Sequence, residues 1–260
     1  MKVLYSRETS IIITGYKGYI AKKLIEKIEV SDWCESNIEN ILEPCTIVHL
    51  AAKADIKDGS VNLLKNNINV DLHILEQCCA NSHRIIYIST NNVYPLKLNC
   101  DEEDGQPPKD SYSLSKFVGE HFLKVLPINQ YIVLRLADVF GSKQKHGNFF
   151  KAIEYSLYHN QPFKLINRGD KLRSYIYIDE LVNILEYSFG IDEFDGRTYN
   201  ICHNEPLSLY DILTIAFNSV HVNTKSSYDY RTMKQSAFFD YSYKFTIQEA
   251  LNEYLLEIRD

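Results

Sequence analysis

The sequence has no long apolar run. Its uninterrupted apolar stretches are short, such as Ile11–Ile13 and Ile86–Ile88, whereas about 20 residues are needed to span a bilayer. Met1–Arg7 carries no secretory pattern. We therefore expect no membrane partner and a cytoplasmic location.

The sequence also lacks a block of basic residues. Its 34 acidic and 28 basic residues give a formal net charge of −6. A polymer of phosphates would be repelled overall rather than gathered by this charge. Nucleic acid is therefore not expected as a partner.

The cysteines lack the spacing typical of metal-binding or redox motifs, because no Cys-x-x-Cys pair occurs. The six cysteines are Cys34, Cys45, Cys78, Cys79, Cys100 and Cys202. We interpret them as reduced, mostly structural thiols. No bound metal is expected, because no group of His and Cys has ligand spacing.

The 260 residues, 45% apolar and 24% charged, can form one sizeable globular domain, alone or with a small appendage. Short β-branched runs alternate with longer helical patterns, which predicts a doubly wound parallel sheet of the α/β class. The predicted strands are Ile11–Thr14, Thr46–Leu50, Arg84–Ser89 and Tyr131–Leu136, and the predicted helices between them are Tyr19–Ile28, Val61–Ala80 and Ser111–Val125.

A glycine-containing segment, Thr14–Ala21, follows the first of these strands and opens a helix, as a dinucleotide-binding turn does. Gly15 permits a tight turn, and Gly18 lets the backbone approach a pyrophosphate at the helix N-terminus. The cofactor contacts predicted here are Gly15, Tyr16, Lys17, Gly18, Tyr19 and Ile20. An ordinary strand–turn–helix is the alternative.

The adenosine end of this pocket is predicted to be abbreviated. Asp32 and Glu35 are the carboxylates near the spacing of about 20 residues at which the ribose is bound, and Asp32 is assigned that role. Only 34 residues separate Gly15 from His49, so one strand–helix unit is missing. Lys17 is then the nearest cation for a 2′-phosphate, which favours NADP and leaves NAD as the alternative.

The pattern also divides the chain. Residues 1–141 are predicted to form the dinucleotide-binding domain, with 171–200 returning to it in part. Residues 142–170 and 201–260 are predicted to form a small, interleaved substrate lobe. The polar connection Lys97–Asp110 is a predicted loop that either overhangs a site or is solvated.

Tyr112 and Lys116 form a Tyr-x-x-x-Lys pair, a spacing that sets both side chains on one face of a helix. With 19 tyrosines and 20 lysines, chance alone predicts about 1.5 such pairs. Position distinguishes this pair, because its helix follows the strand that ends at Ser89–Thr90. A hydroxyl at that strand end can meet the phenol where such sheets bind ligands.

Further motifs occur in order along the chain. They are Val48-His49-Leu50-Ala51-Ala52, Asn69-Val70, Ser89-Thr90-Asn91-Asn92-Val93-Tyr94, Leu134–Gly141, Arg173–Glu180 and Tyr199-Asn200-Ile201. Together with the glycine turn and the Tyr–Lys pair, this set resembles the extended short-chain dehydrogenase/reductase family, in its nucleotide-sugar epimerase and reductase branch. The resemblance covers residues 10–215 and implies a Rossmann-like sheet.

The resemblance implies catalytic roles for three residues. Thr90 would hydrogen-bond the substrate oxygen, Tyr112 would exchange its proton, and Lys116 would hold the nicotinamide ribose. A free phenol titrates near pH 10, and the neighbouring ammonium would lower that pKa. The resemblance also assigns Leu50, Ala51, Ala52 and Asn69, with Tyr112 and Lys116, to cofactor binding.

Two asparagines depart from the family pattern. Nucleotide-sugar 4,6-dehydratases carry Asp and Glu where this chain has Asn91 and Asn92, and amides cannot perform the proton transfers of water elimination. Dual epimerase-reductases tend to have a cysteine in place of Asn92, so a base for proton abstraction beside a carbonyl is also lacking. The implied substrate contacts are Asn91, Asn92, Asp138, Asn148 and Arg173, of which Arg173 suits a diphosphate.

These observations together predict an NAD(P)-dependent oxidoreductase that reduces a keto group, at C4 as first choice, of a nucleotide-linked sugar. A 4-epimerase with tightly held NAD is the first alternative. A non-catalytic dinucleotide sensor is the second, because a fold does not determine a function. By the same resemblance, a homodimer would form through the helices Val61–Ala80 and Ser111–Val125.

Overall fold

The computed structural model describes residues 1–54, 60–144, 149–159, 163, 169–217 and 230–259. In this part of the chain the main sheet has seven strands in the order β10-β6-β5-β4-β2-β1-β3. Their bounds are β1 Lys2–Ser6, β2 Ile11–Thr14, β3 Cys34–Asn37, β4 Thr46–His49, β5 Arg84–Thr90, β6 Tyr131–Leu136 and β10 Thr198–Ile201. Strands β2, β4, β5, β6 and β10 are parallel.

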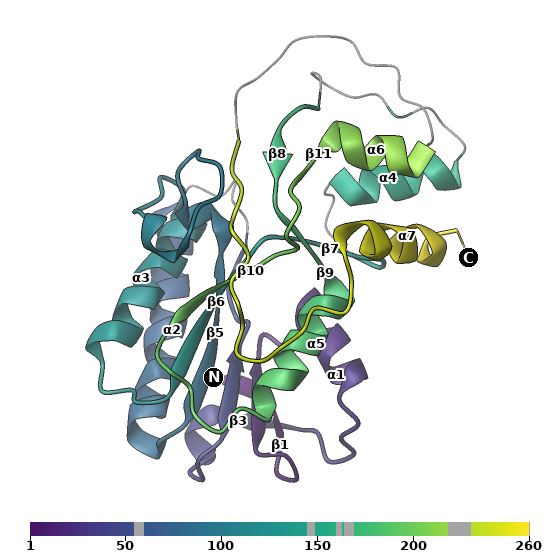
Figure 1. Cartoon of the computed structure of the whole chain (residues 1–260). Coiled ribbons are helices and arrows are strands. Elements are labelled where there is room, and N and C mark those ends of the chain that lie inside the picture. The colour runs from purple at the N-terminus through teal and green to yellow at the C-terminus, as the bar shows by residue number, and fades with distance from the viewer. Residues whose placement is uncertain (55–59, 145–148, 160–162, 164–168, 218–229, 260) are drawn as a thin grey trace.

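Helices cover both faces of this sheet (Figure 1). On one face α2 (Val61–Asn81) packs against α3 (Ser111–Val125), and on the other α1 (Tyr19–Lys27) packs against α5 (Ile178–Phe189). The predicted fold class, a doubly wound Rossmann-like α/β sheet, is confirmed. Among the described residues, no helix combines the length and the apolar character that a membrane crossing requires.

The two-residue period of a strand explains why the central strands are apolar throughout. In β2, Ile11 and Ile13 join the core that α1 and α5 cover, whereas Ile12 joins the core beneath α2 and α3. Because both faces are covered, every β2 position is buried and no polar alternation remains.

The prediction that Ile11–Thr14 is the first strand is wrong. Strand β1 precedes it and runs antiparallel to both β2 and β3. These two short strands occupy the sheet edge from which a strand–helix unit was expected to be missing. Strand β3 escapes sequence patterning because it is polar and mostly exposed, as an edge strand can be.

A smaller group of elements lies at the carboxyl ends of the parallel strands (Figure 1). It contains α4 Phe149–Tyr158, α6 Leu209–Phe217, α7 Ile247–Glu257 and two short strand pairs, β7 Asp138–Phe140 with β9 Tyr175–Tyr177 and β8 Leu172–Arg173 with β11 Leu207–Ser208. Between β9 and β10 the chain returns to the sheet through α5. Three short 3-10 helices lie at Ile38–Asn40, Asn91–Val93 and Glu102–Asp104.

The connection Lys97–Asp110 lies at the β6–β10 side of the sheet. Within it, the Glu102 carbonyl accepts a hydrogen bond from the buried Arg135 at 2.7 Å, and Gly105 is held close to the same guanidinium. The connection borders a second, polar hollow and not the cavity at the glycine turn.

Candidate active site

A cavity of about 350 Å³ lies at the carboxyl ends of the parallel strands. Its walls come from the β2–α1 turn, the segments after β4 and β5, the first turns of α3 and the β6–β7 connection. The predicted site residues that line it are Gly15, Gly18, Tyr19, Ile20, Leu50, Ala52, Thr90, Asn91, Asn92, Tyr112, Lys116 and Asp138. Segments far apart in the sequence thus meet at the edge where doubly wound sheets bind ligands.

The glycine turn has the local geometry that its sequence predicts. Gly15 has φ +64°, and a Cβ there would lie 2.9 Å from backbone atoms of Leu50 and Ala51, so only glycine fits. The Gly18 N–H donates to the Gly15 carbonyl at 2.8 Å. Gly18 is the N-cap of α1 and supplies no side-chain cap, which leaves the amides of the first turn directed at the cavity end.

The assignment of Asp32 to the adenosine ribose is wrong. Its carboxylate accepts the Ser6 hydroxyl at 2.6 Å and the backbone N–H of Arg7 and Glu8 at 2.9 Å. Ser6 pairs with Ile11 at the amino end of β2, so Asp32 lies about 10 Å along the strand direction from the glycine turn at the other end. The spacing rule failed because Asp32 precedes β3 and so lies at the amino end of that strand, away from the glycine turn.

Glu35 is the carboxylate that the structure places near the glycine turn. It accepts the Tyr16 hydroxyl at 2.7 Å and lies 3.9 Å from Lys2 Nζ. Lys17 is exposed, with its Nζ 5.4 Å from the centre of the Tyr16 ring. The edge beyond the turn therefore carries one carboxylate and two exposed lysines.

The predicted tyrosine–lysine pair lies on the first turns of α3, whose N-cap Asp110 accepts the Ser113 N–H at 2.8 Å. Thr90 ends β5, and its hydroxyl oxygen accepts the Asn92 N–H at 3.3 Å. Burial, followed by the charges of Asp71 and Asp110, raises the pKa of Tyr112 to about 12. The phenol therefore keeps its proton at neutral pH in the chain alone.

Lys116 is a buried ammonium without a hydrogen-bond partner among the described residues. Its Nζ lies 4.6 Å from the centre of the Tyr87 ring. Burial lowers the pKa of Lys116, and the charges of Asp71 and Glu120 oppose that shift. A buried polar group usually has a partner, so this ammonium points to a ligand oxygen in the cavity.

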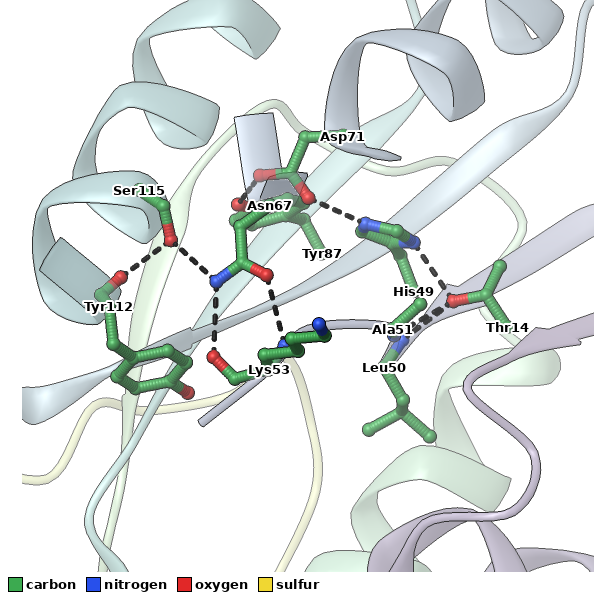
Figure 2. Close-up of polar contacts among 10 residues, drawn as sticks. All are labelled: Thr14, His49, Leu50, Ala51, Lys53, Asn67, Asp71, Tyr87, Tyr112 and Ser115. Carbon is green, nitrogen blue, oxygen red and sulfur yellow. Dashed lines mark hydrogen bonds and ion pairs between the residues drawn. The ribbon is translucent and has the colours of Figure 1, made fainter. Parts of the chain in front are cut away.

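The assignment of Asn69 to cofactor binding is wrong, because Asn69 does not lie on the buried face of α2. Asn69 lies on the exposed face, whereas Asn67 is buried. The Asn67 side chain holds the Lys53 backbone at both its N–H and its carbonyl, at 2.9 and 3.1 Å, and donates to the Ser115 hydroxyl at 3.1 Å (Figure 2). The four-residue step from Leu63 through Asn67 to Asp71 could have identified it.

The opposite end of the cavity carries the predicted substrate residues. The buried Asn91 donates through Nδ2 to Asp138 Oδ1 at 3.2 Å. Asp138 is open to solvent on the cavity side. Desolvation by the surrounding residues raises its pKa, and the Asn91 hydrogen bond and the charges of Arg173 and Arg231 oppose that shift. Among the described lining residues, Asp138 carries the only carboxyl group.

Arg231 does not line the cavity itself, but it contacts a lining residue and was missed by sequence reasoning. Its Nη1 donates to Asn92 Oδ1 at 2.5 Å, and its backbone forms a bridge with Arg173 of β8. Arg173 itself lies beside the cavity and not in its lining. The predicted contact Asn148 lies outside the described residues. No local motif marks Arg231, because the segment that carries it lies far along the chain from Asn92.

The fold places the chain among Rossmann-like α/β proteins, and a family model specifies its membership. Residues 27–202 match the model described as "NAD dependent epimerase/dehydratase family". The chain belongs to this family, and the resemblance inferred from the motifs is confirmed.

Two curated relatives illustrate the range of this similarity. The chain is 27% identical to dTDP-D-glucose 4,6-dehydratase of Dictyostelium discoideum over 75% of its own length and 50% of that protein. It is 24% identical to dTDP-4-dehydro-6-deoxyglucose reductase of Escherichia coli, covering 82% of both chains. The chain thus spans about half the length of some of its curated relatives.

Solved structures share the fold at low identity. The UDP-N-acetylglucosamine 4-epimerase of Bacillus cereus has a TM-score of 0.81 at 20% identity, over 96% of this chain and 99% of that one. The structure of RMD from Pseudomonas aeruginosa complexed with NADPH has a TM-score of 0.77 at 18% identity, over 95% and 96%. These likenesses extend the match from the family segment to almost the whole chain.

Proposed function

We propose that this chain is an NAD(P)-dependent oxidoreductase that reduces the C4 keto group of a nucleotide-linked sugar. The observation that carries the proposal is the buried ammonium of Lys116, which has no hydrogen-bond partner among the described residues and lines one cavity with Tyr112, Thr90 and the glycine turn. The similarity to a dTDP-4-dehydro-6-deoxyglucose reductase supports the same reaction class.

The cavity residues fit a nicotinamide dinucleotide along its length. Gly15 and Gly18 would admit the pyrophosphate at the uncapped end of α1. Leu50, Ala51 and Ala52 would flank the dinucleotide, and the Lys116 ammonium would bind the ribose hydroxyls near its reactive end. When bound, the cofactor supplies or accepts the hydride.

The protein residues would then handle the oxygen of the substrate carbonyl. Thr90 would hydrogen-bond that oxygen, and Tyr112 would donate its proton as the hydride arrives at carbon. The pKa of Tyr112, raised to about 12 by burial, keeps the phenol protonated and so favours reduction over oxidation as the first step. Asn91, Asn92 and Asp138 would contact the sugar, with Arg231 fixing the amide of Asn92.

Dehydration lacks its acid–base pair among the described residues that line the cavity. The strand end after β5 presents two amides, Asn91 and Asn92, and amides do not transfer protons at neutral pH. Asp138 supplies one carboxyl group on the opposite wall, whereas water elimination needs both an acid and a base.

A 4-epimerase is the second candidate, favoured by the same trio, which could oxidise C4 and return the hydride to the other face. A spectrophotometric screen of nucleotide-sugars and their 4-keto forms tests both activities. A reductase consumes NADPH or NADH in proportion to product, whereas an epimerase interconverts sugars without net consumption. Saturable cofactor binding without turnover on any sugar would favour the non-catalytic sensor instead.

Cofactor preference belongs to the same proposal, with NADP favoured over NAD. The exposed Lys17 and Lys2 would contact a 2′-phosphate at the edge of the glycine turn, whereas Asp32 lies at the other end of the sheet. Glu35 favours NAD by its charge. Titrations of NADPH and NADH into the parent and into Lys17→Ala decide between them, because equal affinities in the parent contradict the assignment.

We also propose a homodimer formed through α2 and α3. Apolar residues recur every four positions on the half-buried faces of both helices: Leu64, Ile68 and Leu72 on α2, and Leu114, Val118 and Phe122 on α3. A second copy would bury both rows, and sedimentation velocity of the parent and of Leu72→Glu tests this arrangement.

The division of the chain and its cellular location are part of the same proposal. Residues 142–170 and 201–260 would form the substrate lobe, to which Arg231 belongs. All six cysteines are described and none is disulfide-bonded, which supports a reducing, cytoplasmic location. Cell fractionation of the tagged chain tests it.

A further inference from the structure

A buried line of polar side chains runs beneath the candidate active site, from the glycine turn towards α3 (Figure 2). The Thr14 hydroxyl oxygen lies 2.9 Å from His49 Nδ1, and His49 Nε2 lies 2.8 Å from Asp71 Oδ1. The Tyr87 hydroxyl donates to Asp71 Oδ2 at 2.6 Å. All four side chains are buried, so water does not compete for these bonds.

Donor and acceptor capacities fix the protons along this line. The Thr14 oxygen accepts the backbone N–H of Leu50 and Ala51, both at 3.0 Å, which occupies both of its lone pairs. Its own proton must therefore go to His49 Nδ1. The imidazole is then neutral with its proton on Nε2, donated to Asp71, and burial lowers the pKa of His49 in agreement.

Asp71 is the anion that faces the cavity ammonium. The ring of Tyr87, whose hydroxyl binds Asp71, lies 4.6 Å below Lys116 Nζ. Gly119, nearly one helical turn after Lys116, leaves space for the Asp71 and Tyr87 side chains, because a Cβ there would lie 2.6 Å from Asp71 Oδ2. Burial raises the pKa of Asp71, but the Lys116 charge and the His49 hydrogen bond outweigh it and hold that pKa below its usual value.

The other titratable groups around Lys116 are neutral or already paired. His49 on β4 is neutral, and burial keeps the phenols of Tyr87 on β5 and Tyr112 on α3 protonated. Glu120 on α3 accepts two hydrogen bonds from Arg135, at 3.0 and 2.6 Å, so its charge is compensated. Asp71 on α2 is left as the counter-charge for the ammonium.

We infer that Asp71 is a positioning residue that keeps Lys116 charged beneath the nicotinamide site. Hydrogen bonds through His49 and Thr14 also connect Asp71 to the backbone N–H groups of Leu50 and Ala51. This inference rests on the proposed function, because it assigns Lys116 to cofactor binding. Removing the Asp71 charge would leave only Glu120, whose charge Arg135 compensates, to oppose the burial of the ammonium, so Lys116 would lose its proton at lower pH. The deprotonated Lys116 would then bind the dinucleotide less tightly at alkaline pH.

The test compares the parent with Asp71→Asn, and uses Glu76→Gln, an exposed carboxylate on the same helix, as the matched control. NMR of ¹³C-labelled lysine, with Lys116 assigned from Lys116→Met, follows the ammonium directly without cofactor. We expect Lys116 in Asp71→Asn to bind its proton about tenfold more weakly, one pKa unit, and Glu76→Gln to match the parent. An unchanged Lys116 titration in Asp71→Asn overturns the inference.

NADPH titration over a range of pH gives the second readout. Asp71→Asn should bind NADPH nearly as the parent does at pH 6 and about tenfold more weakly at the alkaline end of the range. In a Lys116→Met background, Asp71→Asn should not change the pH dependence of NADPH affinity. An equal loss at every pH would indicate a merely structural role and overturn the inference. If the parent binds neither NADPH nor NADH, the proposed function fails while the NMR titration still decides the role of Asp71.

Should Asp71→Asn not fold, the parent alone remains decisive. Nitrogen-15 NMR of its imidazoles should show His49 neutral, with the proton on Nε2, between pH 5 and 8. A protonated His49, or one with its proton on Nδ1, contradicts the proton order and overturns the inference.

Discussion

At the scale of single residues, burial sets the protonation states that the chemistry uses. Tyr112 and Lys116 are four residues apart on α3, yet burial moves their pKa values in opposite directions, upward for the phenol and downward for the ammonium. Each shift favours the uncharged form. A bound dinucleotide that partners the ammonium would reinforce its charge, so cofactor binding would prepare the site for proton transfer.

Tyr112→Phe should lower turnover by about 100-fold or more while leaving cofactor affinity nearly unchanged, because it removes only the proton donor. Steady-state assays and NADPH titration separate the two quantities. Tyr155→Phe, on the exposed face of α4, is the matched control. Normal turnover by Tyr112→Phe, or an equal loss in the control, would show that the active site is misplaced.

His203 should make stability depend on pH. Its buried Nε2 accepts the Tyr177 N–H at 3.2 Å, and burial lowers its pKa to about 4, below the value near 6.5 in the unfolded chain. The unfolded state therefore binds more protons between these values, and stability falls as pH drops from about 6.5 to 4. Urea unfolding of His203→Gln should show a weaker decline over this range, and parallel curves would contradict the assignment.

At the scale of elements, α3 must approach the sheet closely to place its catalytic pair. Gly119 permits this approach at the point where the helix crosses Tyr87. The same helix carries Glu120, whose ion pair with Arg135 fixes it to β6. The position of Tyr112 at the cavity therefore depends on a small residue and a buried ion pair further along the helix.

Gly119→Ala should destabilise the fold by about 1–3 kcal/mol, the usual range for overpacking, although alanine is the better helix former. A Cβ there would lie 2.0 Å from the Tyr87 hydroxyl oxygen and 2.6 Å from Asp71 Oδ2. Gly190→Ala is the control, since its Cβ would meet nothing closer than 3.6 Å. The urea midpoints of unfolding measure the stability of both variants. Equal destabilisation by Gly119→Ala and Gly190→Ala would contradict the role of Gly119 in helix–sheet packing.

At the scale of the whole molecule, the segment around residues 230–245 links the smaller group of elements to the cavity. It runs beside β10 and reaches β8 (Figure 1), and Met233 forms a bridge with Cys100. Glu180 of α5 accepts the backbone N–H of Lys244 and Phe245, which fixes the far end of the segment. Arg231 is thereby held where it can orient Asn92.

Arg231→Lys should raise KM for the sugar-nucleotide about tenfold or more, because lysine cannot reproduce the guanidinium fork, with cofactor affinity unchanged. Lys234→Arg, in the same segment, is the control for an exchange between lysine and arginine that keeps the charge. A change in NADPH affinity as large as the change in KM would place Arg231 at the cofactor and not at the sugar.

The sequence by itself determined the class of fold and the centre of the site. Buried parallel strands are apolar throughout, the glycine turn needs Gly15, and the Tyr112–Lys116 spacing depends only on helical periodicity. Each of these signals is local, so its physical cause is contained in a few consecutive residues. That is why the strands and helices flanking the cavity could be predicted.

Only the tertiary structure decided which polar residues reach the cavity. Asn69 stays outside because it lies on the exposed face of α2, and Asp32 stays outside because it precedes β3 at the end remote from the glycine turn. Arg231 meets Asn92 across a sequence separation of 139 residues. Such contacts depend on how elements pack and cross, and packing energies are summed over the whole core rather than encoded at any one position.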